Sequence, residues 1–315
     1  MRRKQPLNED AGDRRPQLSW SHLPPCDAVV IVVMMGTAPR LPPLTRALGS
    51  LIRQLLRDKK TRSTEKTFVF EGAKSCLDLI RRHPRSIRSL IVSPRYLHTE
   101  TGADRRMRAT LPARQFVCSD AVFEKLTDVE MPQGMLAIVR QPQWDDSRVF
   151  TQSRIFGIYG DRLQDPGNVG AIIRTAAALN LSGVWLSADS ADHWSPKVVR
   201  ATAGTVLSLP IFQVRDVHGF AAHGCTLYSA LPPSAQTVPI RSILRMPSRF
   251  VIAVGSEGRG LAPDVVKASQ VTFSIPLAQG VESLNVAATA AISAFYFSGL
   301  PLDAEVGSAM PQRIA

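Results

Sequence analysis

Three segments in the second half of the chain combine small residues with polar side chains that could bind a ligand and act on it. The first runs from Asp161 to Ala176 and reads as a helix that carries Asn168 and Arg174, with Gly170 and Ala171 allowing close approach of another backbone. An amide and a guanidinium can hold phosphate oxygens and stabilise developing negative charge. Taken alone, the segment fits a capped helix with a solvated arginine equally well.

The second segment runs from Val251 to Leu261 and predicts a buried strand followed by a glycine-rich loop. Gly255, Gly258 and Gly260 surround one carboxylate, Glu257. Glycines let the backbone approach a ligand, and open parallel sheets bind ligands at the carboxyl ends of their strands. The glycine spacing is not GxGxxG, and the sequence has no GxxxxGK[ST] segment, so the usual dinucleotide and nucleoside-triphosphate sites are not supported.

The third segment runs from Ile275 to Ala291, where a strand breaks at Pro276 and loops through Gly280 into an alanine-rich helix. Such a helix can pass through a narrow space. Ser283 and Asn285 lie at its start, where a hydroxyl or amide can satisfy free backbone N–H groups. Alone, this segment would be an ordinary serine-capped helix packed on a sheet.

The elements that position these segments alternate between strand and helix. We expect strands at 154–159, 184–187, 211–214, 226–229, 250–255 and 271–275. We expect helices at 168–179, 196–203 and 284–297. This alternation predicts an α/β fold with a parallel sheet that helices cover on both faces.

The first half of the chain predicts a smaller α/β module. From Leu48 an amphipathic helix with a basic surface runs into a basic loop that ends near Lys66. Strands are expected at 67–70, 89–92, 116–118 and 134–139, with helices at 73–80 and 121–126. We therefore divide the chain into a mostly disordered leader at 1–45, a small domain at 46–140, a linker at 141–153, a large domain at 154–300 and a tail at 301–315.

The charge of the chain favours a polyanionic partner. The 315 residues carry a formal net charge of +12. Residues 1–150 hold 26 Lys and Arg against 16 Asp and Glu, whereas residues 151–315 hold 12 against 10. A basic surface gains affinity for nucleic acid by displacing counterions from phosphates, although a basic segment can also serve only solubility. The first half is thus expected to grip an anion.

The sequence offers no pattern for a metal site, a disulfide framework or a membrane span. The four cysteines form no CxxC pair, the six histidines form no HExxH, and a reducing cytoplasm fits this usage. The longest apolar run, Ala28 to Met35, is much shorter than the roughly 20 residues that cross a bilayer. Acidic residues and prolines before this run disfavour a signal peptide. A translation start further downstream would also explain the unusual composition of this N-terminal segment.

Together and in this order, the three segments resemble the SpoU/TrmH family of RNA 2′-O-ribose methyltransferases in the SPOUT superfamily. The resemblance covers residues 154–298. The basic module, with its Phe70-Glu71-Gly72, resembles the ribosomal-protein-like substrate-binding domain of that family. The resemblance implies a trefoil knot in the C-terminal domain, a homodimer through the knot region with each active site near the partner chain, and S-adenosyl-L-methionine as cofactor.

The resemblance also implies roles for particular residues. Gly255, Ile275 and Leu284 correspond to positions that hold the cofactor, and the polar active-site set corresponds to Asn168, Arg174, Glu257, Ser283 and Asn285. A guanidinium hardly deprotonates, so we expect Arg174 to hold a phosphate and stabilise the developing alkoxide, with Ser283 or a water taking part in proton transfer. Phosphate contacts from the basic helix and loop are expected at Arg53, Arg57, Lys59, Lys60 and Arg62.

The substrate is expected to be RNA, because only RNA offers a 2′-hydroxyl. The appended basic domain favours ribosomal RNA over transfer RNA. Two alternatives stay open: the same chemistry on transfer RNA, and a non-catalytic RNA-binding or ribosome-assembly factor that keeps the fold. The sequence departs from the commonest family pattern at Ala178-Leu179-Asn180 and Ala287-Ala288-Thr289, which are packing positions.

Overall fold

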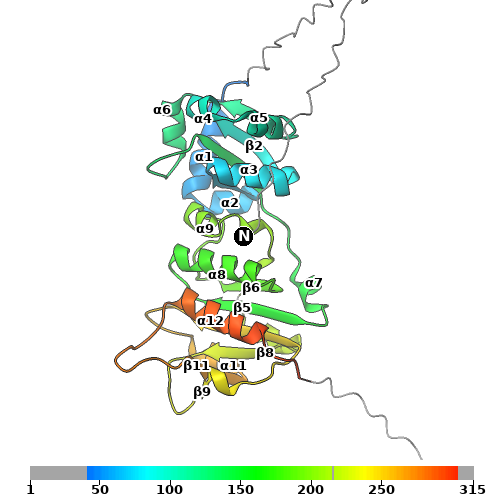
Figure 1. Cartoon of the computed structure of the whole chain (residues 1–315), viewed down its shortest axis with the longest axis vertical. Coiled ribbons are helices and arrows are strands. Elements are labelled where there is room, and N and C mark those ends of the chain that lie inside the picture. Colours follow the sequence, from blue (N-terminus) through cyan, green and yellow to red (C-terminus); the bar gives the residue numbers. More distant parts are fainter. Residues whose placement is uncertain (1–40, 215, 304–315) are drawn as a thin grey trace, which may run out of the picture. The chain divides into compact units, whose positions relative to one another are not determined.

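Two β-sheets organise the residues that the computed structural model describes, which are 41–214 and 216–303 (Figure 1). The first sheet has four strands and belongs to the first half of the chain. The second has seven and belongs to the second half. Most of the leader predicted as disordered, and the tail beyond residue 303, lie outside the described residues.

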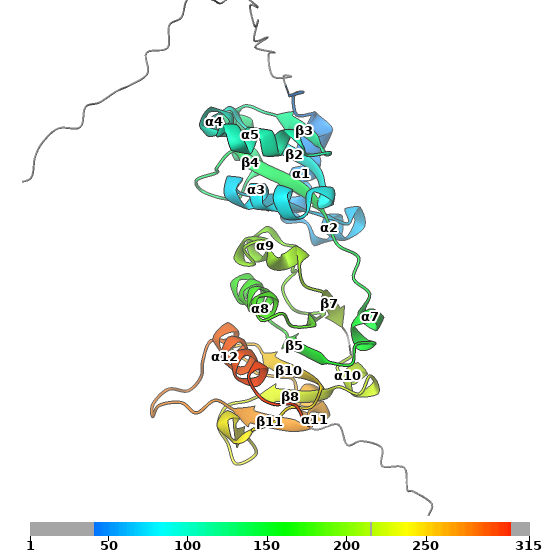
Figure 2. The same ribbon diagram turned by 45° about the vertical axis from the view of Figure 1, so that its right-hand side comes forward.

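The smaller sheet has the strand order β1-β4-β2-β3, in which β4 runs antiparallel to both neighbours and β2 runs parallel to β3. Figure 2 shows β4, β2 and β3 side by side. Its strands are β1 (Thr67–Glu71), β2 (Ile87–Val92), β3 (Arg114–Val117) and β4 (Met135–Arg140). The helices around it are α1 (Arg46–Arg57), α2 (Lys59–Glu65), α3 (Ala73–Arg82), α4 (Pro94–Thr99), α5 (Gly102–Ala109) and α6 (Asp120–Phe123), with short 3₁₀ turns at Pro84–Ser86 and Glu124–Leu126.

Helix α1 forms as the amphipathic pattern predicts, burying Ile52 and Leu55 against the smaller sheet. The expectation of a basic loop after it is wrong, because residues 59–65 form helix α2. Asp58 explains this second helix: its carboxylate accepts hydrogen bonds from the backbone N–H groups of Lys60 (3.1 Å) and Thr61 (2.8 Å) and so caps a new N-terminus.

The larger sheet has the order β7-β6-β5-β10-β8-β11-β9 with every neighbouring pair parallel, which confirms the predicted α/β class. Its strands are β5 (Ile155–Asp161), β6 (Gly183–Ser187), β7 (Ile211–Val214), β8 (Thr226–Ala230), β9 (Val238–Pro239), β10 (Arg249–Gly255) and β11 (Val271–Ser274). The helices are α7 (Asp146–Phe150), α8 (Pro166–Ala178), α9 (Pro196–Ala201), α10 (Gly219–Ala222), α11 (Pro263–Ala268) and α12 (Val286–Ser298), with 3₁₀ turns at Thr205–Leu207 and Ile240–Ser242. Helix α7 lies within the segment expected to be an irregular linker.

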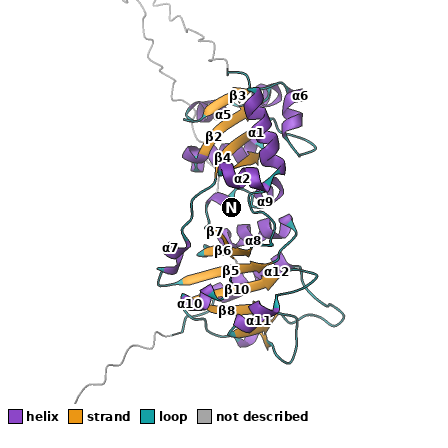
Figure 3. Cartoon of the chain, turned by 180° about the vertical axis from the view of Figure 1, so that it is seen from behind, coloured by secondary structure: helices purple, strands orange, loops and turns teal. Residues whose placement is uncertain are grey.

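Alternation along the central strand β10 builds one core on each face of the larger sheet. Figure 3 shows the strands of this sheet in orange and the helices that flank them in purple. Phe250, Ile252 and Val254 belong to the core that α8, α9 and α12 cover. Val251 and Ala253 belong to the opposite core, which α7, α10 and α11 cover. Strands buried on both faces read as continuous apolar runs, and the sequence of β10 has this character.

Two helix boundaries differ from the sequence prediction, and both concern site residues. Helix α8 begins at Pro166 after the cap Asp165, so Asn168, the predicted first residue, lies in the first turn. Pro166 at the first helical position and an aspartate before it are a known start signal. Helix α12 is capped by Asn285 and not by Ser283, so it begins at Val286.

Gly170 on α8 faces Ala201 of α9 so closely that a Cβ on it would come within 2.3 Å of the Ala201 Cβ. This glycine therefore sets how closely the two helices approach.

Within residues 41–214 and 216–303, no helix combines the length and apolar character needed to cross a membrane. The same residues contain no cluster of three or more His, Cys, Asp or Glu side chains that could hold a metal ion.

Candidate active site

The three chemically suggestive segments follow three strands of the larger sheet at the carboxyl ends. The first follows β5, the second follows β10 and the third follows β11. Strands β5 and β10 are direct neighbours, and Asp161 pairs with Gly255 at their last positions. Because parallel strands end at the same edge of a sheet, the loops after them meet there.

A hydrogen-bonded chain of polar side chains joins all three segments. The Asn285 amide donates to the Asn168 side-chain carbonyl at 3.0 Å, and the Asn168 amide donates to the carboxylate of Glu257. The Asn285 carbonyl also accepts from the backbone N–H groups of Ala287 (2.9 Å) and Ala288 (3.2 Å). Asn285 thus caps α12 with one end of its amide and holds Asn168 with the other.

The loop that carries Glu257 is fastened to the end of β5. The buried carboxylate of Asp161 accepts a hydrogen bond from the Ala262 backbone N–H at 2.7 Å and also pairs with the Arg162 guanidinium at 3.2 Å. The same guanidinium donates to the backbone carbonyl of Gly260 at 3.3 Å. Asp161 and Arg162, which precede α8, therefore fix the loop that follows β10.

Gly255 lets this loop fold back on itself. A Cβ at Gly255 would lie 2.2 Å from the carbonyl carbon of Gly260, so no larger residue fits without movement of the backbone. A bridge between Ser256 and Gly260 closes the turn, with the Gly260 N–H donating to the Ser256 carbonyl at 2.8 Å. The glycines expected to favour ligand approach thus also shape the loop.

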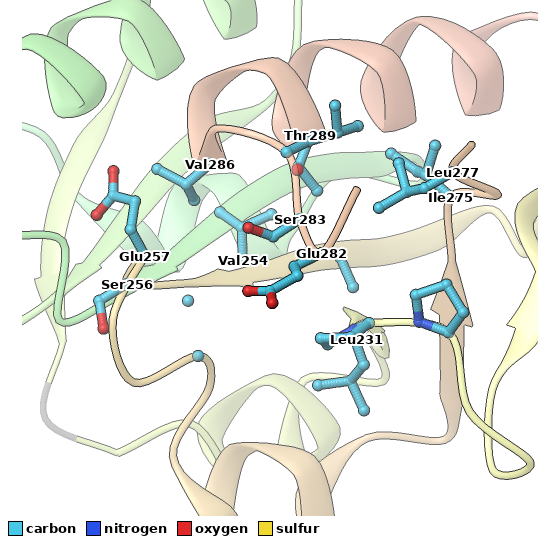
Figure 4. Close-up of a pocket in the computed structure, with 16 residues that line it drawn as sticks. Leu231, Val254, Ser256, Glu257, Ile275, Leu277, Glu282, Ser283, Val286 and Thr289 are labelled. Carbon is cyan, nitrogen blue, oxygen red and sulfur yellow. The ribbon is translucent and has the colours of Figure 1, made fainter. Parts of the chain in front are cut away.

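A cleft opens beside this network between the loops that follow β8, β10 and β11 (Figure 4). The three expected cofactor-holding residues, Gly255, Ile275 and Leu284, all line it. Glu257 and Ser283 also line it. Five of the eight residues singled out as the catalytic and cofactor-binding sets therefore border one cavity, and Asn168 and Asn285 are bonded to Glu257 at its edge.

The lining of the cleft fits S-adenosylmethionine. Apolar side chains such as Leu231, Val254 and Leu277 can pack against a flat purine, and the carboxylates of Glu257 and Glu282 suit a ligand that carries a sulfonium and an ammonium group. The exposed backbone of a glycine loop beside them supplies hydrogen-bonding groups at close range. The residues present would hold the cofactor by its base and by its positive charge.

Arg174 is not part of this cleft. It is exposed on α8, six positions beyond Asn168, which places it about 9 Å further along the helix axis. Among the described residues its guanidinium makes no hydrogen bond or ion pair. The hydrogen-bonded chain thus joins three of the five expected polar residues, Ser283 lines the cleft beside them, and Arg174 lies apart.

Four of the five basic residues expected to contact RNA are exposed, namely Arg53, Arg57, Lys59 and Lys60. Arg62 is not. Its side chain is buried, its Nε pairs with the carboxylate of Asp192 at 2.8 Å, and its Nη1 donates to the carbonyl of Leu55 at 2.6 Å. The structure thus corrects the prediction for Arg62, which holds the first half of the chain to the second and is unavailable to a phosphate.

Sequence reasoning missed several residues of the site. The sequence predicts no role for Asp161 and Arg162, which hold the loop, or for Ser256 and Glu282, which line the cleft. The Asp165-Pro166 pair carried a recognisable helix-start signal. The tie from Asp161 to Ala262 had no signal, because it joins residues 101 positions apart.

Comparison with known proteins finds matches for both halves of the chain. Residues 156–295 match the SpoU rRNA Methylase family, and residues 52–137 match the MRM3-like substrate binding domain. An uncharacterized tRNA/rRNA methyltransferase of Synechocystis is 36% identical over 189 residues, which are 59% of this chain and 66% of that protein. The 23S rRNA (guanosine(2553)-2′-O)-methyltransferase RlmP of Bacillus subtilis is 28% identical over 249 residues, which are 78% of this chain and 93% of that protein.

Among solved structures, an AdoMet-bound rRNA methyltransferase from Sinorhizobium meliloti is similar with a TM-score of 0.68 and 26% identity, covering 81% of this chain and 95% of that one. The resemblance drawn from the three segments is confirmed, and residues 156–295 form a domain of the SpoU rRNA methylase family.

Proposed function

We propose that this protein transfers the methyl group of S-adenosylmethionine to a ribose 2′-hydroxyl of RNA, with ribosomal RNA as the favoured substrate. The observation that carries the proposal is the chain from Asn285 through Asn168 to Glu257, which joins three distant segments at the edge of one cleft. The SpoU rRNA methylase domain, relatives that are named as 23S rRNA 2′-O-methyltransferases and the matched substrate-binding domain support it.

The reaction breaks the bond between sulfur and the methyl carbon, forms a bond from that carbon to the 2′-oxygen, and releases the hydroxyl proton. When bound, the cofactor supplies an electrophilic methyl group. The protein must hold the hydroxyl in line with the methyl carbon and accommodate the charge that develops on oxygen. These two tasks call for rigid polar groups on the cleft wall.

The side chains divide these tasks between them. Glu257, held by Asn168, and Asn168, held by Asn285, form a fixed edge against which the ribose is oriented. Ser283 lines the cleft and takes part in moving the hydroxyl proton, directly or through a water. Arg174 holds the adjacent phosphate and stabilises the developing alkoxide.

A homodimer accounts for the position of Arg174. Helix α12 presents exposed apolar side chains, Phe295 (73% exposed) and Ile292 (44% exposed), and it packs against α8, which carries Arg174. Pairing two chains through α12 would cover these side chains and would let Arg174 of one protomer serve the cleft of the other. The C-terminal segment that leads into α12 is proposed to form the trefoil knot, and the protein is proposed to act in the cytoplasm.

Mixed dimers test this arrangement. Arg174→Ala and Asn285→Asp chains, each strongly impaired alone, should regain up to one working site per dimer when they are refolded together. If Arg174 acts within its own chain, the mixture stays impaired, and each mixed dimer carries two damaged sites.

The proposed reaction is tested by transfer of labelled methyl from S-adenosylmethionine to RNA that lacks modifications. Labelling of ribosomal RNA with little labelling of transfer RNA is expected. Preferential labelling of transfer RNA would favour the same chemistry on that substrate. Binding of the cofactor and of RNA without any transfer would favour the non-catalytic alternative.

A further inference from the structure

A second hollow lies in the small domain, away from the cleft. It has a volume of about 780 Å³ and is lined by the start of α1 and by residues of β2, β3 and β4. Four arginines border it, and we call it the arginine groove after them: Arg85, Arg88, Arg114 and Arg140. All four are exposed.

We propose that the arginine groove binds an unpaired segment of the RNA substrate, a proposal that rests on the proposed function. The four arginines come from three neighbouring strands and the turn before them, so the sheet places them together. Arg114 lies opposite Ser89 in the pairing of β2 with β3, and Arg140 is the last residue of β4.

A β-bulge contributes to this placement. The register between β2 and β4 shifts between Ile87 and Ser89, which leaves Arg88 as the extra residue. Bulges turn a side chain away from the regular alternation of a strand and are common beside functional sites. Arg140 is held in position because its guanidinium donates to the backbone carbonyls of Arg85 (3.1 Å) and Ile87 (3.2 Å).

The positive charge of the groove is largely uncompensated. Arg88 pairs with Glu65 at 3.0 Å, and both side chains are about 40% exposed. In the described part of the chain, Arg85, Arg114 and Arg140 have no carboxylate partner. Several guanidinium groups gathered without counter-charges repel each other and favour an anionic ligand. Guanidinium groups match phosphate oxygens with paired hydrogen bonds.

The apolar residues that line the groove favour unpaired RNA over a duplex as its ligand. Leu48, Leu51 and Phe116 line it and are only partly buried. A duplex offers a protein mainly phosphates and ribose hydroxyls, whereas an unpaired base can leave the stack and lie on an aromatic or aliphatic surface. Arginines around an apolar floor with one aromatic ring suit a base flanked by phosphates.

The groove differs from the basic surface of α1 and α2. There, Asp58 lies between the basic residues Arg57 and Lys59, and its carboxylate caps α2. Such a surface attracts RNA without selecting a conformation. The groove, in contrast, is a hollow that can enclose one or two nucleotides.

The test measures binding of a labelled 12-nucleotide unpaired RNA and of a hairpin of the same length to the full chain by fluorescence anisotropy over a range of salt. A variant with Gln at the four groove arginines should bind the unpaired RNA at least tenfold more weakly, and its salt slope should fall by about 2 to 3 units. Phe116→Leu, which keeps every charge, should weaken binding of the unpaired RNA about tenfold and of the hairpin much less.

A matched control replaces four exposed arginines on α3 and α5 with Gln: Arg81, Arg82, Arg105 and Arg106. Equal losses in the groove variant and in this control would overturn the proposal. Thermal unfolding of each variant shows that it is folded. Binding and methyl transfer are measured separately. If the wild type transfers methyl groups and the groove variant binds RNA normally, the groove proposal fails and the proposed function stands. If RNA binding depends on the groove but the wild type transfers no methyl group, the proposed function fails and the groove proposal stands.

Discussion

The cleft and the arginine groove differ in whether their polar side chains already have partners within the protein. In the cleft, Glu257, Asn168 and Asn285 are tied to one another and to the ends of strands and helices, so their geometry exists before any ligand arrives. In the groove, most charges have no partner of opposite sign among the described residues. The contrast suggests that the larger domain is built for precise chemistry and the smaller one for affinity, and the predictions below separate the two.

The largest effect is expected from Arg174→Ala. Loss of a group that stabilises charge only in the transition state should reduce turnover about 10³-fold. Cofactor affinity should stay within about twofold, because Arg174 does not line the cleft. Calorimetry and single-turnover methyl transfer measure the two quantities, and near wild-type turnover would refute the role.

The second largest effect is expected from a substitution that separates the two roles of the Asn285 amide, which caps α12 and holds Asn168. Asp is as good a helix cap as Asn, so Asn285→Asp should keep the stability of α12, yet it lacks the N–H that holds Asn168. Turnover should fall about 10²-fold with an unchanged melting temperature. Asn285→Ala serves as the comparison, because it should also lose about 1 kcal/mol of stability. Full activity of Asn285→Asp would show that the chain of side chains is dispensable.

A pH effect should arise between the domains and not in either site. Burial lowers the pKa of His193 to about 4, with Lys59 adding to the decrease and Asp192 opposing it. Because this folded-state value lies below the unfolded one, the unfolded chain binds the extra proton, and stability is lost as pH falls from about 6.5 toward 4. The loss is on the order of 2 kcal/mol.

His193→Gln should flatten this dependence when the midpoint of thermal unfolding is followed against pH. His98→Gln at an exposed position provides the control and should leave the slope intact. An equal slope in wild type and His193→Gln would exclude this histidine as the source.

The smallest effect is expected on the helical basic surface. The double change Arg57→Glu and Lys60→Glu should weaken RNA binding about fivefold at ~0.15 M salt and reduce the salt slope. Methyl transfer at saturating RNA should not change. An effect as large as that of the groove variant would remove the distinction between a steering surface and a shaped contact.

The parts of this molecule that the sequence predicts are those with local signals. The continuous apolar run of β10 and the alternating elements around it led to the parallel sheet, and glycines beside Glu257 marked the loop. Helix α2 escaped prediction because its start depends on the carboxylate of one residue, Asp58, in a polar stretch without apolar periodicity.

Long-range ties account for what sequence reasoning could not supply. The salt bridge that buries Arg62 against Asp192 spans 130 positions, and a basic residue in a basic run gives no sign of it. The tie from Asp161 to the Glu257 loop is equally silent in the sequence. The residue types in the sequence indicated where the site lies, whereas the hydrogen-bond partners of those residues could be identified only from the folded structure.

The most direct measurement is alkaline hydrolysis of RNA that the protein has labelled in a single turnover. A 2′-O-methyl group removes the hydroxyl that alkali needs, so the account predicts label in alkali-resistant dinucleotides, and none with Asn285→Asp on the same timescale. Label recovered in mononucleotides would place the methyl group on a base and contradict the account.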